Sequence, residues 1–119
     1  MERVHFLEHK GKKVLYVDYS GLKANSITEV LDEVKRITNK EPRGSLFMLC
    51  NFESMQFNST TISQFKSFTT EFMEYNKAVA LIGIKGLQKI AYEAVSKIIK
   101  TKMPIFNTKE EALDWLTNK

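Results

Sequence analysis

The chain has 119 residues, of which 43% are apolar and 27% charged, with two prolines, five glycines and one cysteine. This composition is typical of a single globular domain spanning residues 1–119, and it excludes a disordered chain, a collagen and a disulfide scaffold. No apolar stretch is long enough to span a bilayer, and the charged first ten residues lack the apolar core of a signal peptide, so we expect a cytoplasmic protein. The lone Cys50 suits that reducing compartment.

The net charge of +4 is concentrated between Lys77 and Lys102, where six lysines accompany one glutamate. A basic surface of this kind suits an acidic protein partner or a phosphate, and the alternative interpretation is a solvated helix face. The segment contains no arginine and one aromatic residue, Tyr92. The pattern therefore does not favour binding to nucleic acid.

The first third of the chain predicts a hairpin followed by a helix. The strands are expected at Val4–Leu7 and Lys13–Tyr19, on either side of a turn that contains Gly11. Ser26 and Glu29 have the spacing of a capping box. Apolar residues then recur with helical period at Ile27, Val30, Leu31, Val34 and Ile37, and Pro42 prevents the helix from continuing.

The remainder alternates between uninterrupted apolar strands and amphipathic helices. The strands are expected at Ser45–Cys50, Val79–Ile84 and Ile105–Phe106. A second helix opens near Asn58–Thr61, with Thr61 and Gln64 as a capping pair, and the last helix opens with a capping box at Thr108–Glu111. A third helix begins at Gly86, and its expected core face is formed by Leu87, Ile90, Ala91, Ala94 and Ile98.

The resulting order is β-β-α-β-α-β-α-β-α. Strands buried on both faces and separated by helices predict an α/β fold with a mainly parallel central sheet. We expect four or five strands, an antiparallel edge strand and about four helices.

Three stretches carry a resemblance to a known family: Val14–Gly21, the loop Asn51–Thr61 and the tail Phe106–Leu116. The chain resembles the STAS superfamily, specifically the SpoIIAA-like branch of small domains related to anti-sigma-factor antagonists. The resemblance implies the SpoIIAA-like fold. It also implies a regulatory, protein-binding role in a bacterial cytoplasm, with no cofactor.

The resemblance also implies a site. In the antagonists this loop carries an Asp-Ser-Ser-Gly signature, whose first serine is phosphorylated by a partner kinase. Ser59 matches that serine and Thr60 the next hydroxyl, whereas Asn58 replaces the acidic residue and Thr61 the glycine. Asn58, Ser59, Thr60 and Thr61 are therefore the candidate partner-binding or regulatory residues.

The second helix carries a wide aromatic stripe formed by Phe65, Phe68, Phe72 and Tyr75. Because the stripe is wider than one sheet face requires, we expect Phe68 and Tyr75 to remain exposed. The stripe then has three candidate uses: additional core, a homodimer surface, or the wall of a pocket for a small apolar, lipid-like ligand.

The sequence predicts no catalytic or metal site. His5 and His9 both lie in the first hairpin, and Cys50 ends an interior strand, so no nucleophile has a base beside it and no metal-ligand set is complete. Lys85, Gly86 and Lys89 form a candidate anion site at a helix start. The alternative is that Gly83 lets a helix pack closely and Gly86 makes the turn.

Polar side chains are expected to converge beyond the carboxyl ends of the parallel strands, where ligands of such sheets bind. The set comprises Asp18, Tyr19, Ser20, Asn51, Glu53, Asn58, Ser59, Thr60 and Lys85. Its alternative interpretation is local, with an ion pair between Glu53 and Lys85. The leading functional hypothesis is a non-catalytic regulatory module that binds a protein partner through the 58–61 loop and the following helix. The alternative hypothesis is a protein that binds a small apolar or anionic ligand.

Overall fold

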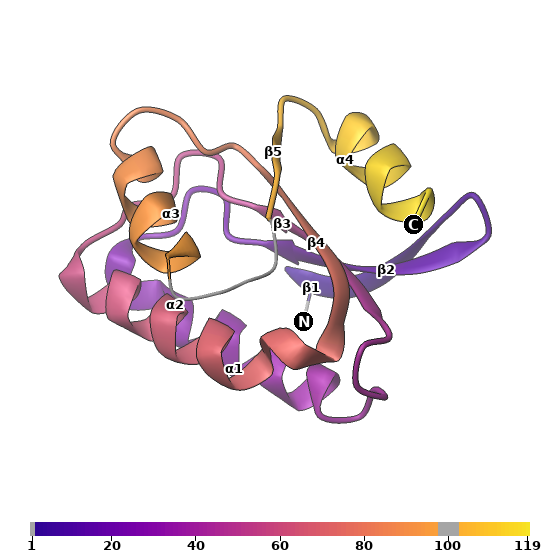
Figure 1. The fold of residues 1–119 in the computed structure, drawn as a ribbon. Helices are drawn as coiled ribbons and strands as arrows, with labels where there is room; N and C mark the ends of the chain where they lie inside the picture. Colours follow the sequence, from indigo (N-terminus) through magenta and orange to yellow (C-terminus); the bar gives the residue numbers. More distant parts are fainter. Residues whose placement is uncertain (1, 98–102) are drawn as a thin grey trace.

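The protein is built around a twisted sheet in which neighbouring strands follow the order β1-β2-β3-β4-β5 (Figure 1). A computed structural model describes residues 2–97 and 103–119. Within these residues the strands are β1 (Val4–His9), β2 (Lys12–Asp18), β3 (Leu46–Asn51), β4 (Asn76–Ile82) and β5 (Ile105–Phe106). The β1 strand is antiparallel to β2, and every other neighbouring pair is parallel. The predicted α/β fold with its antiparallel edge strand is confirmed.

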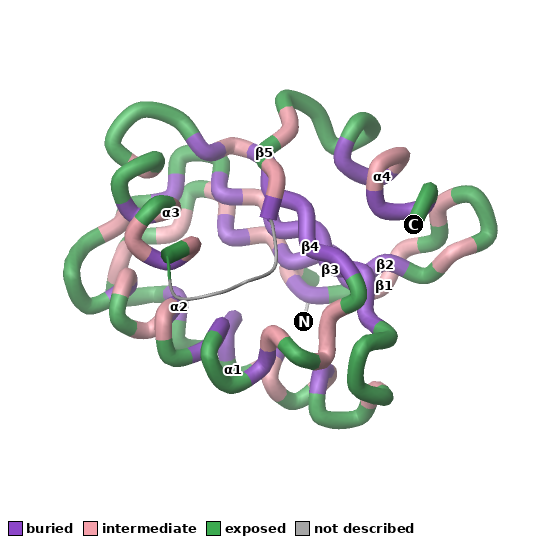
Figure 2. The backbone as a smooth tube through the Cα atoms, viewed as in Figure 1, coloured by how far each residue is buried: buried purple, intermediate pink, exposed green. Residues whose placement is uncertain are grey.

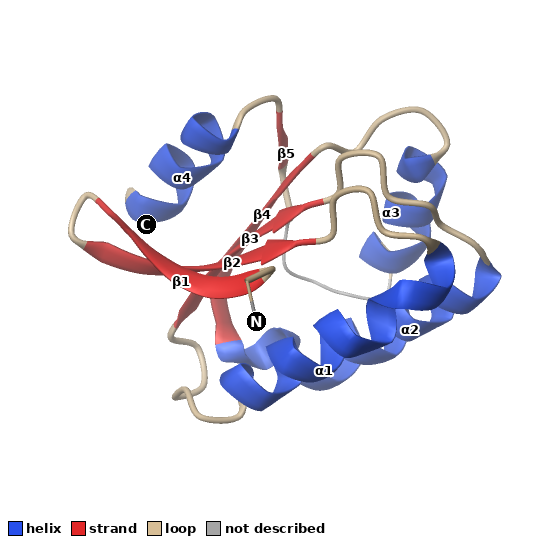
Figure 3. Ribbon diagram, turned by 180° about the vertical axis from the view of Figure 1, so that it is seen from behind, coloured by secondary structure: helices blue, strands red, loops and turns tan. Residues whose placement is uncertain are grey.

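Helices cover both faces of the sheet, as Figure 3 shows from behind. One face packs against three helices, α1 (Ile27–Thr38), α2 (Ser59–Phe72) and α3 (Gln88–Ser96), and the other packs against α4 (Lys109–Thr117). Two short 3-10 turns, Ala24–Ser26 and Met73–Tyr75, precede α1 and follow α2. Among the described residues, none of the helices is both long and apolar enough to cross a membrane.

Figure 2 shows that the central strands are buried along most of their length. Their side chains alternate between two cores, one on each face of the sheet. Met48 and Cys50 of β3 point toward α1–α3, whereas Phe47 and Leu49 point toward the core under α4. This burial explains why β3 and β4 are continuous apolar runs, as the sequence predicts.

Two of the predicted helix caps are wrong. Ser26 does not cap α1 with its side chain, because a 3-10 turn precedes the helix and leaves Ser26 outside the extended conformation that a cap requires. At α2 the cap lies three residues earlier than predicted, between Asn58 and Thr61. The Asn58 Oδ1 accepts from the Thr61 amide and the Thr61 Oγ1 accepts from the Asn58 amide, both at 2.9 Å. Gln64 instead donates to Thr28 Oγ1.

The predicted core face of α3 is right for Ala91, which is buried, and wrong for Leu87 and Ile90. Leu87 is 84% exposed and Ile90 is 64% exposed, whereas Ala91 and Val95 are buried. The buried stripe is shifted by one residue, which is about 100° around the helix. Gln88 occupies the inward position because its Nε2 donates to the carbonyl oxygens of two residues in the β3–α2 loop. The predicted core residue Ile98 lies outside the described residues.

Candidate functional site

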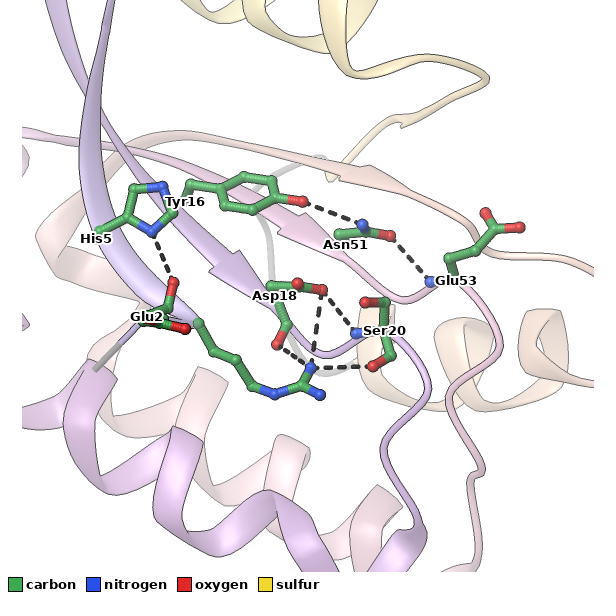
Figure 4. A network of polar contacts seen from close by, with 8 residues as sticks. Glu2, His5, Tyr16, Asp18, Ser20, Asn51 and Glu53 are labelled. Carbon is green, nitrogen blue, oxygen red and sulfur yellow. Dashed lines mark hydrogen bonds and ion pairs between the residues drawn. The ribbon is translucent and has the colours of Figure 1, made fainter.

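The loops that follow β2 and β3 hold the polar residues that the sequence places at the carboxyl edge of the sheet (Figure 4). The Asp18 Oδ1 accepts from the Ser20 amide at 2.8 Å, and the Asn51 Oδ1 accepts from the Glu53 amide at 3.0 Å. Arg3 adds a third link, since its Nη1 donates to the carbonyl oxygens of Asp18 and Ser20. These residues lie close together, as the sequence predicts. Their hydrogen bonds are made to the backbone of the loops and hold the loops in place.

Tyr19 departs from this polar set. Its side chain is 2% exposed, and its ring stacks on Phe52 with 4.9 Å between ring centroids. The prediction that Tyr19 contributes to a polar surface is therefore wrong. Burial raises the pKa of the Tyr19 hydroxyl well above its usual value.

The β3–α2 loop lies very close to the residue that follows β4, and that residue is a glycine. Gly83 has a φ of +82°, and a Cβ built there would lie 2.4 Å from the amide nitrogen of Glu53. The Phe52 amide also donates to the carbonyl oxygen of Ile82 at 2.9 Å. Gly83 therefore allows close approach of this loop, not of a helix as the sequence analysis predicts.

The start of α2 presents three exposed polar residues, Asn58, Ser59 and Thr60. Thr61 is fully buried and serves the helix cap, so it is not an accessible contact residue. Ser59 is the first residue of α2, where the positive end of the helix dipole favours negative charge. The accessible part of the predicted site is thus Asn58–Thr60.

An apolar groove of about 550 Å³ lies directly beside this loop, between the start of α2 and α3. We call it the docking groove. Its principal lining residues are Phe57, Asn58, Ile62, Leu87, Ile90 and Ala91. Leu87 and Ile90 are the two most exposed large apolar side chains of the described residues, although their spacing predicts a place in the core.

The candidate anion site at the start of α3 is partly occupied by the protein itself. The Lys85 Nζ lies 3.6 Å from the Glu53 carboxylate, which is the predicted ion pair. The Lys85 amide donates to the side chain of Gln88, and the amides of Gln88 and Lys89 donate to carbonyl oxygens one turn earlier. An anion would have to displace these bonds and the ion pair of Lys85, whereas the Lys89 side chain is exposed.

The aromatic stripe of α2 is more buried than predicted. Phe65, Phe68 and Phe72 are all buried, and Phe68 is only 7% exposed, so its predicted exposure is wrong. Tyr75 is half-buried and packs against the core. These side chains therefore do not form the exposed patch on which a homodimer surface was predicted.

Phe65 and Phe68, but not Phe72, help to line an interior cavity of about 70 Å³ between the sheet and α2 and α3. Its walls include Cys50, Phe65, Phe68, Leu81 and Val95. We refer to it as the interior cavity. Two of the three predicted uses of the stripe, core and pocket wall, are thus compatible with its position.

The titratable residues do not assemble into a reactive centre within the described residues. Burial raises the pKa of the Cys50 thiol to about 12, so the thiol is protonated at neutral pH. His5 binds the backbone oxygen of Glu2, and His9 Nε2 lies 2.8 Å from Asp114 Oδ1. Residues 2–97 and 103–119 contain no group of three or more histidine, cysteine, aspartate or glutamate side chains placed to hold a metal ion.

Two solved structures share this architecture. An uncharacterized DUF3478 protein from Shewanella loihica PV-4, described as having a SpoIIAA-like fold, is 16% identical and superposes with a TM-score of 0.76. The match covers 95% of this chain and 91% of that chain. The chain has the SpoIIAA-like fold.

A second similar structure is an anti-sigma-factor antagonist (STAS) domain protein from Planctomyces limnophilus. It is 14% identical, has a TM-score of 0.65, and the match covers 96% of this chain and 97% of that chain. No family model and no curated protein matches the sequence. The resemblance to the SpoIIAA-like branch is therefore confirmed for the fold, and the role of each residue in this SpoIIAA-like chain rests on its own geometry.

Proposed function

We propose that this SpoIIAA-like chain is a non-catalytic regulatory module that binds a protein partner through the docking groove and the adjoining residues Asn58–Thr60. The observation that carries the proposal is the exposure of Leu87 and Ile90 beside the loop. Large apolar side chains that line a groove and are rimmed by polar residues are typical of interaction sites. The described STAS domain protein, an anti-sigma-factor antagonist, shares the fold and agrees with a regulatory role.

The basic residues beside the groove indicate the charge of the partner surface that would complement it. Lys85 and Lys89 lie within two residues of Leu87, and both are exposed. The complementary partner surface has an apolar anchor for the groove and acidic residues around it, because opposite charges steer association and fix register.

Ser59 is the position on this surface where phosphorylation would regulate partner binding. A phosphate on Ser59 would add a charge of about −2 at the start of α2. The helix dipole favours that charge by about 0.3–1 kcal/mol, so α2 should stay folded. The same charge would stand beside a groove whose partner is acidic, and we therefore expect phosphorylation to weaken partner binding.

A pull-down with four variants tests the proposal. Wild-type protein should recover a partner that the double variant Leu87→Ser, Ile90→Ser does not, whereas Ile105→Ser should behave as wild type, because Ile105 is exposed but lies outside the groove. Ser59→Asp should reduce recovery, and Ser63→Asp, one turn further along the same helix, should not. Equal recovery by the wild type and the double variant would contradict the proposal.

The interior cavity favours a second candidate function, the binding of a small apolar ligand. Its walls are formed by buried aromatic and aliphatic side chains, among them Phe65, Phe68 and Val95. Apolar cavities of this kind stay dry and accept apolar molecules. Native mass spectrometry of protein purified from cells tests this function, since a bound molecule adds its mass to the chain. A mass equal to the chain alone in every charge state would oppose it.

A further inference from the structure

The helix α3 has its large apolar side chains on the outside and smaller ones on the inside. Leu87, which immediately precedes the helix, and Ile90 are exposed, whereas Ala91 and Val95 are buried and line the interior cavity. Apolar side chains are stabilised by burial, and side chains that line a void lose packing contacts. The observed rotation of α3 therefore leaves apolar stabilisation unused on both of its sides.

The exposed and the buried stripes of α3 lie one residue apart. A rotation of the helix by one residue, about 100°, would exchange Tyr92 and Val95 for Leu87 and Ile90 on the inner side and would keep Ala91 there. The same rotation would remove Leu87 and Ile90 from the docking groove, which both of them line. One helix thus carries two alternative packing faces, and only one of them builds the groove.

Polar contacts hold α3 in the observed rotation. The Gln88 Nε2 donates to the carbonyl oxygens of Phe52 and Met55, both at 2.9 Å, and the Tyr92 hydroxyl donates to the carbonyl oxygen of Met103 at 2.7 Å. Each hydrogen bond contributes modestly, because water competes for the same groups. A few polar contacts are therefore balanced against two exposed apolar side chains, and two packings of similar free energy are what a conformational switch requires.

The surroundings of α3 allow it to turn. The helix packs mainly against α2, beside one end of the sheet (Figure 1). Gly86 lies just before the helix, has a φ of +56°, and has no described atom within 4 Å of a Cβ placed on it. A glycine in open space can take up the change in backbone angles that the rotation requires.

We propose that α3 is a switch with two packed states, and that the second state closes the docking groove. In the open state, which is the one observed, Leu87 and Ile90 line the groove. In the closed state they pack against the walls of the interior cavity. A partner that binds these two side chains stabilises the open state, because a ligand shifts an equilibrium towards the state that it binds better. This regulation rests on the proposed docking function, whereas the existence of the two states does not.

Thiol labelling of single introduced cysteines measures the two states without a partner. Ile90→Cys reports on the exposed stripe, Val95→Cys on the buried stripe, and Ile105→Cys is an exposed reference outside α3. The native Cys50 contributes little, because burial raises the pKa of its thiol to about 12. In an otherwise wild-type chain, position 90 should label as fast as position 105, and position 95 more slowly.

Gln88→Glu should drive α3 towards the closed state. The substitution keeps the size of the side chain, removes both donated hydrogen bonds and places a carboxylate against two carbonyl oxygens. Losing two hydrogen bonds shifts the equilibrium about tenfold or more, so labelling at position 95 should accelerate about tenfold and labelling at position 90 should slow. Gln64→Glu is the matched control. Its side chain bonds to Thr28 between α1 and α2, so neither rate should change.

Leu87→Ser tests the same equilibrium from the opposite side and leaves the hydrogen bonds of Gln88 in place. Only the closed state buries the Leu87 side chain, so the variant should slow labelling at position 95 by about tenfold or more. Labelling that proceeds through local unfolding would not slow, because Leu87 is already exposed in the open state.

Three results would overturn the proposal. They are an unchanged rate at position 95 in Gln88→Glu, acceleration there without slowing at position 90, which indicates a detached helix, and an unchanged rate at position 95 in Leu87→Ser. In the pull-down, Gln88→Glu should also lower partner recovery. The expected labelling together with full recovery would support the two states and contradict docking at the groove, so the two failures are distinguishable.

Discussion

Replacing Gly83 with alanine tests how the β3–α2 loop is positioned beside the docking groove. The substitution acts in two ways. Gly83 has a φ of +82°, which L-residues with a Cβ adopt at a cost of about 1–2 kcal/mol. In addition, the new Cβ would lie 2.4 Å from the amide nitrogen of Glu53 and 2.8 Å from its Cα, so the backbone of the loop must move.

The chain contains a matched control. Gly86 also has a positive φ, +56°, but a Cβ added there meets no atom within 4 Å. Both substitutions restrict the unfolded chain equally, which offsets about 0.4–1 kcal/mol in each variant. The difference between them therefore isolates the overlap with Glu53. Overpacking of this kind typically costs about 1–3 kcal/mol.

Urea denaturation followed by circular dichroism measures the two free energies of unfolding. We expect Gly83→Ala to be less stable than Gly86→Ala by about 1–3 kcal/mol, with a lower midpoint and an unchanged slope in denaturant. Equal midpoints for the two variants would refute the close approach between Gly83 and the loop.

Three further variants test the helix caps and the clamp, which is the pair of hydrogen bonds from Gln88 to the β3–α2 loop, and a labelling reaction tests the buried thiol. Asn58→Ala should lose about 1 kcal/mol of stability because the α2 capping box is broken, whereas Ser26→Ala should change stability by less than about 0.5 kcal/mol, both read by urea denaturation. Gln88→Leu should cost about 1–3 kcal/mol, because it leaves two loop carbonyl oxygens without their donor; an unchanged midpoint would show that the clamp is not formed. Cys50 should react with Ellman's reagent at least about 30-fold more slowly in the folded protein than a thiol with the ordinary pKa of 9.0, because burial raises its pKa to about 12 and the loss of thiolate outweighs the greater nucleophilicity of a more basic thiol. Similar rates before and after denaturation would contradict that burial.

The sequence was sufficient for the architecture. Continuous apolar runs at β3 and β4 predict strands covered on both faces, and the turn at Gly11 predicts the hairpin. These signals are strong because burial on two sides leaves no polar position in a strand. The order of strands and helices then follows from the rules for parallel connections.

The candidate site was less predictable because it depends on helix rotation. Ala91 belongs to both the predicted and the observed stripe, and the observed neighbours Tyr92 and Val95 are as apolar as the predicted neighbours Leu87 and Ile90. The choice between them is made by Gln88, whose side chain bonds to the backbone of a loop more than thirty residues earlier. Because helical periodicity carries no information about that long-range contact, it assigns the exposed residues Leu87 and Ile90 to the core.

The aromatic stripe of α2 is a second case in which helical periodicity alone does not decide which side chains are buried, and here the side chains are more buried than predicted. Its width correctly predicts more apolar surface than one flat sheet face would cover. The structure places the additional area against α3 and around the interior cavity, where Phe65 and Phe68 lie. Tyr19 was predicted to join the polar residues beyond the carboxyl ends of the strands, but its ring stacks on Phe52 and is buried.

The most direct test of partner docking is photo-crosslinking from the groove in cells that express the protein. A benzophenone amino acid is introduced in place of Ile90 in one variant and in place of Ile105 in another, since both side chains are exposed. We predict a crosslinked product of discrete mass from position 90, absent from position 105 and reduced by Ser59→Asp. The same products from both positions, or none from position 90, would contradict docking at this groove.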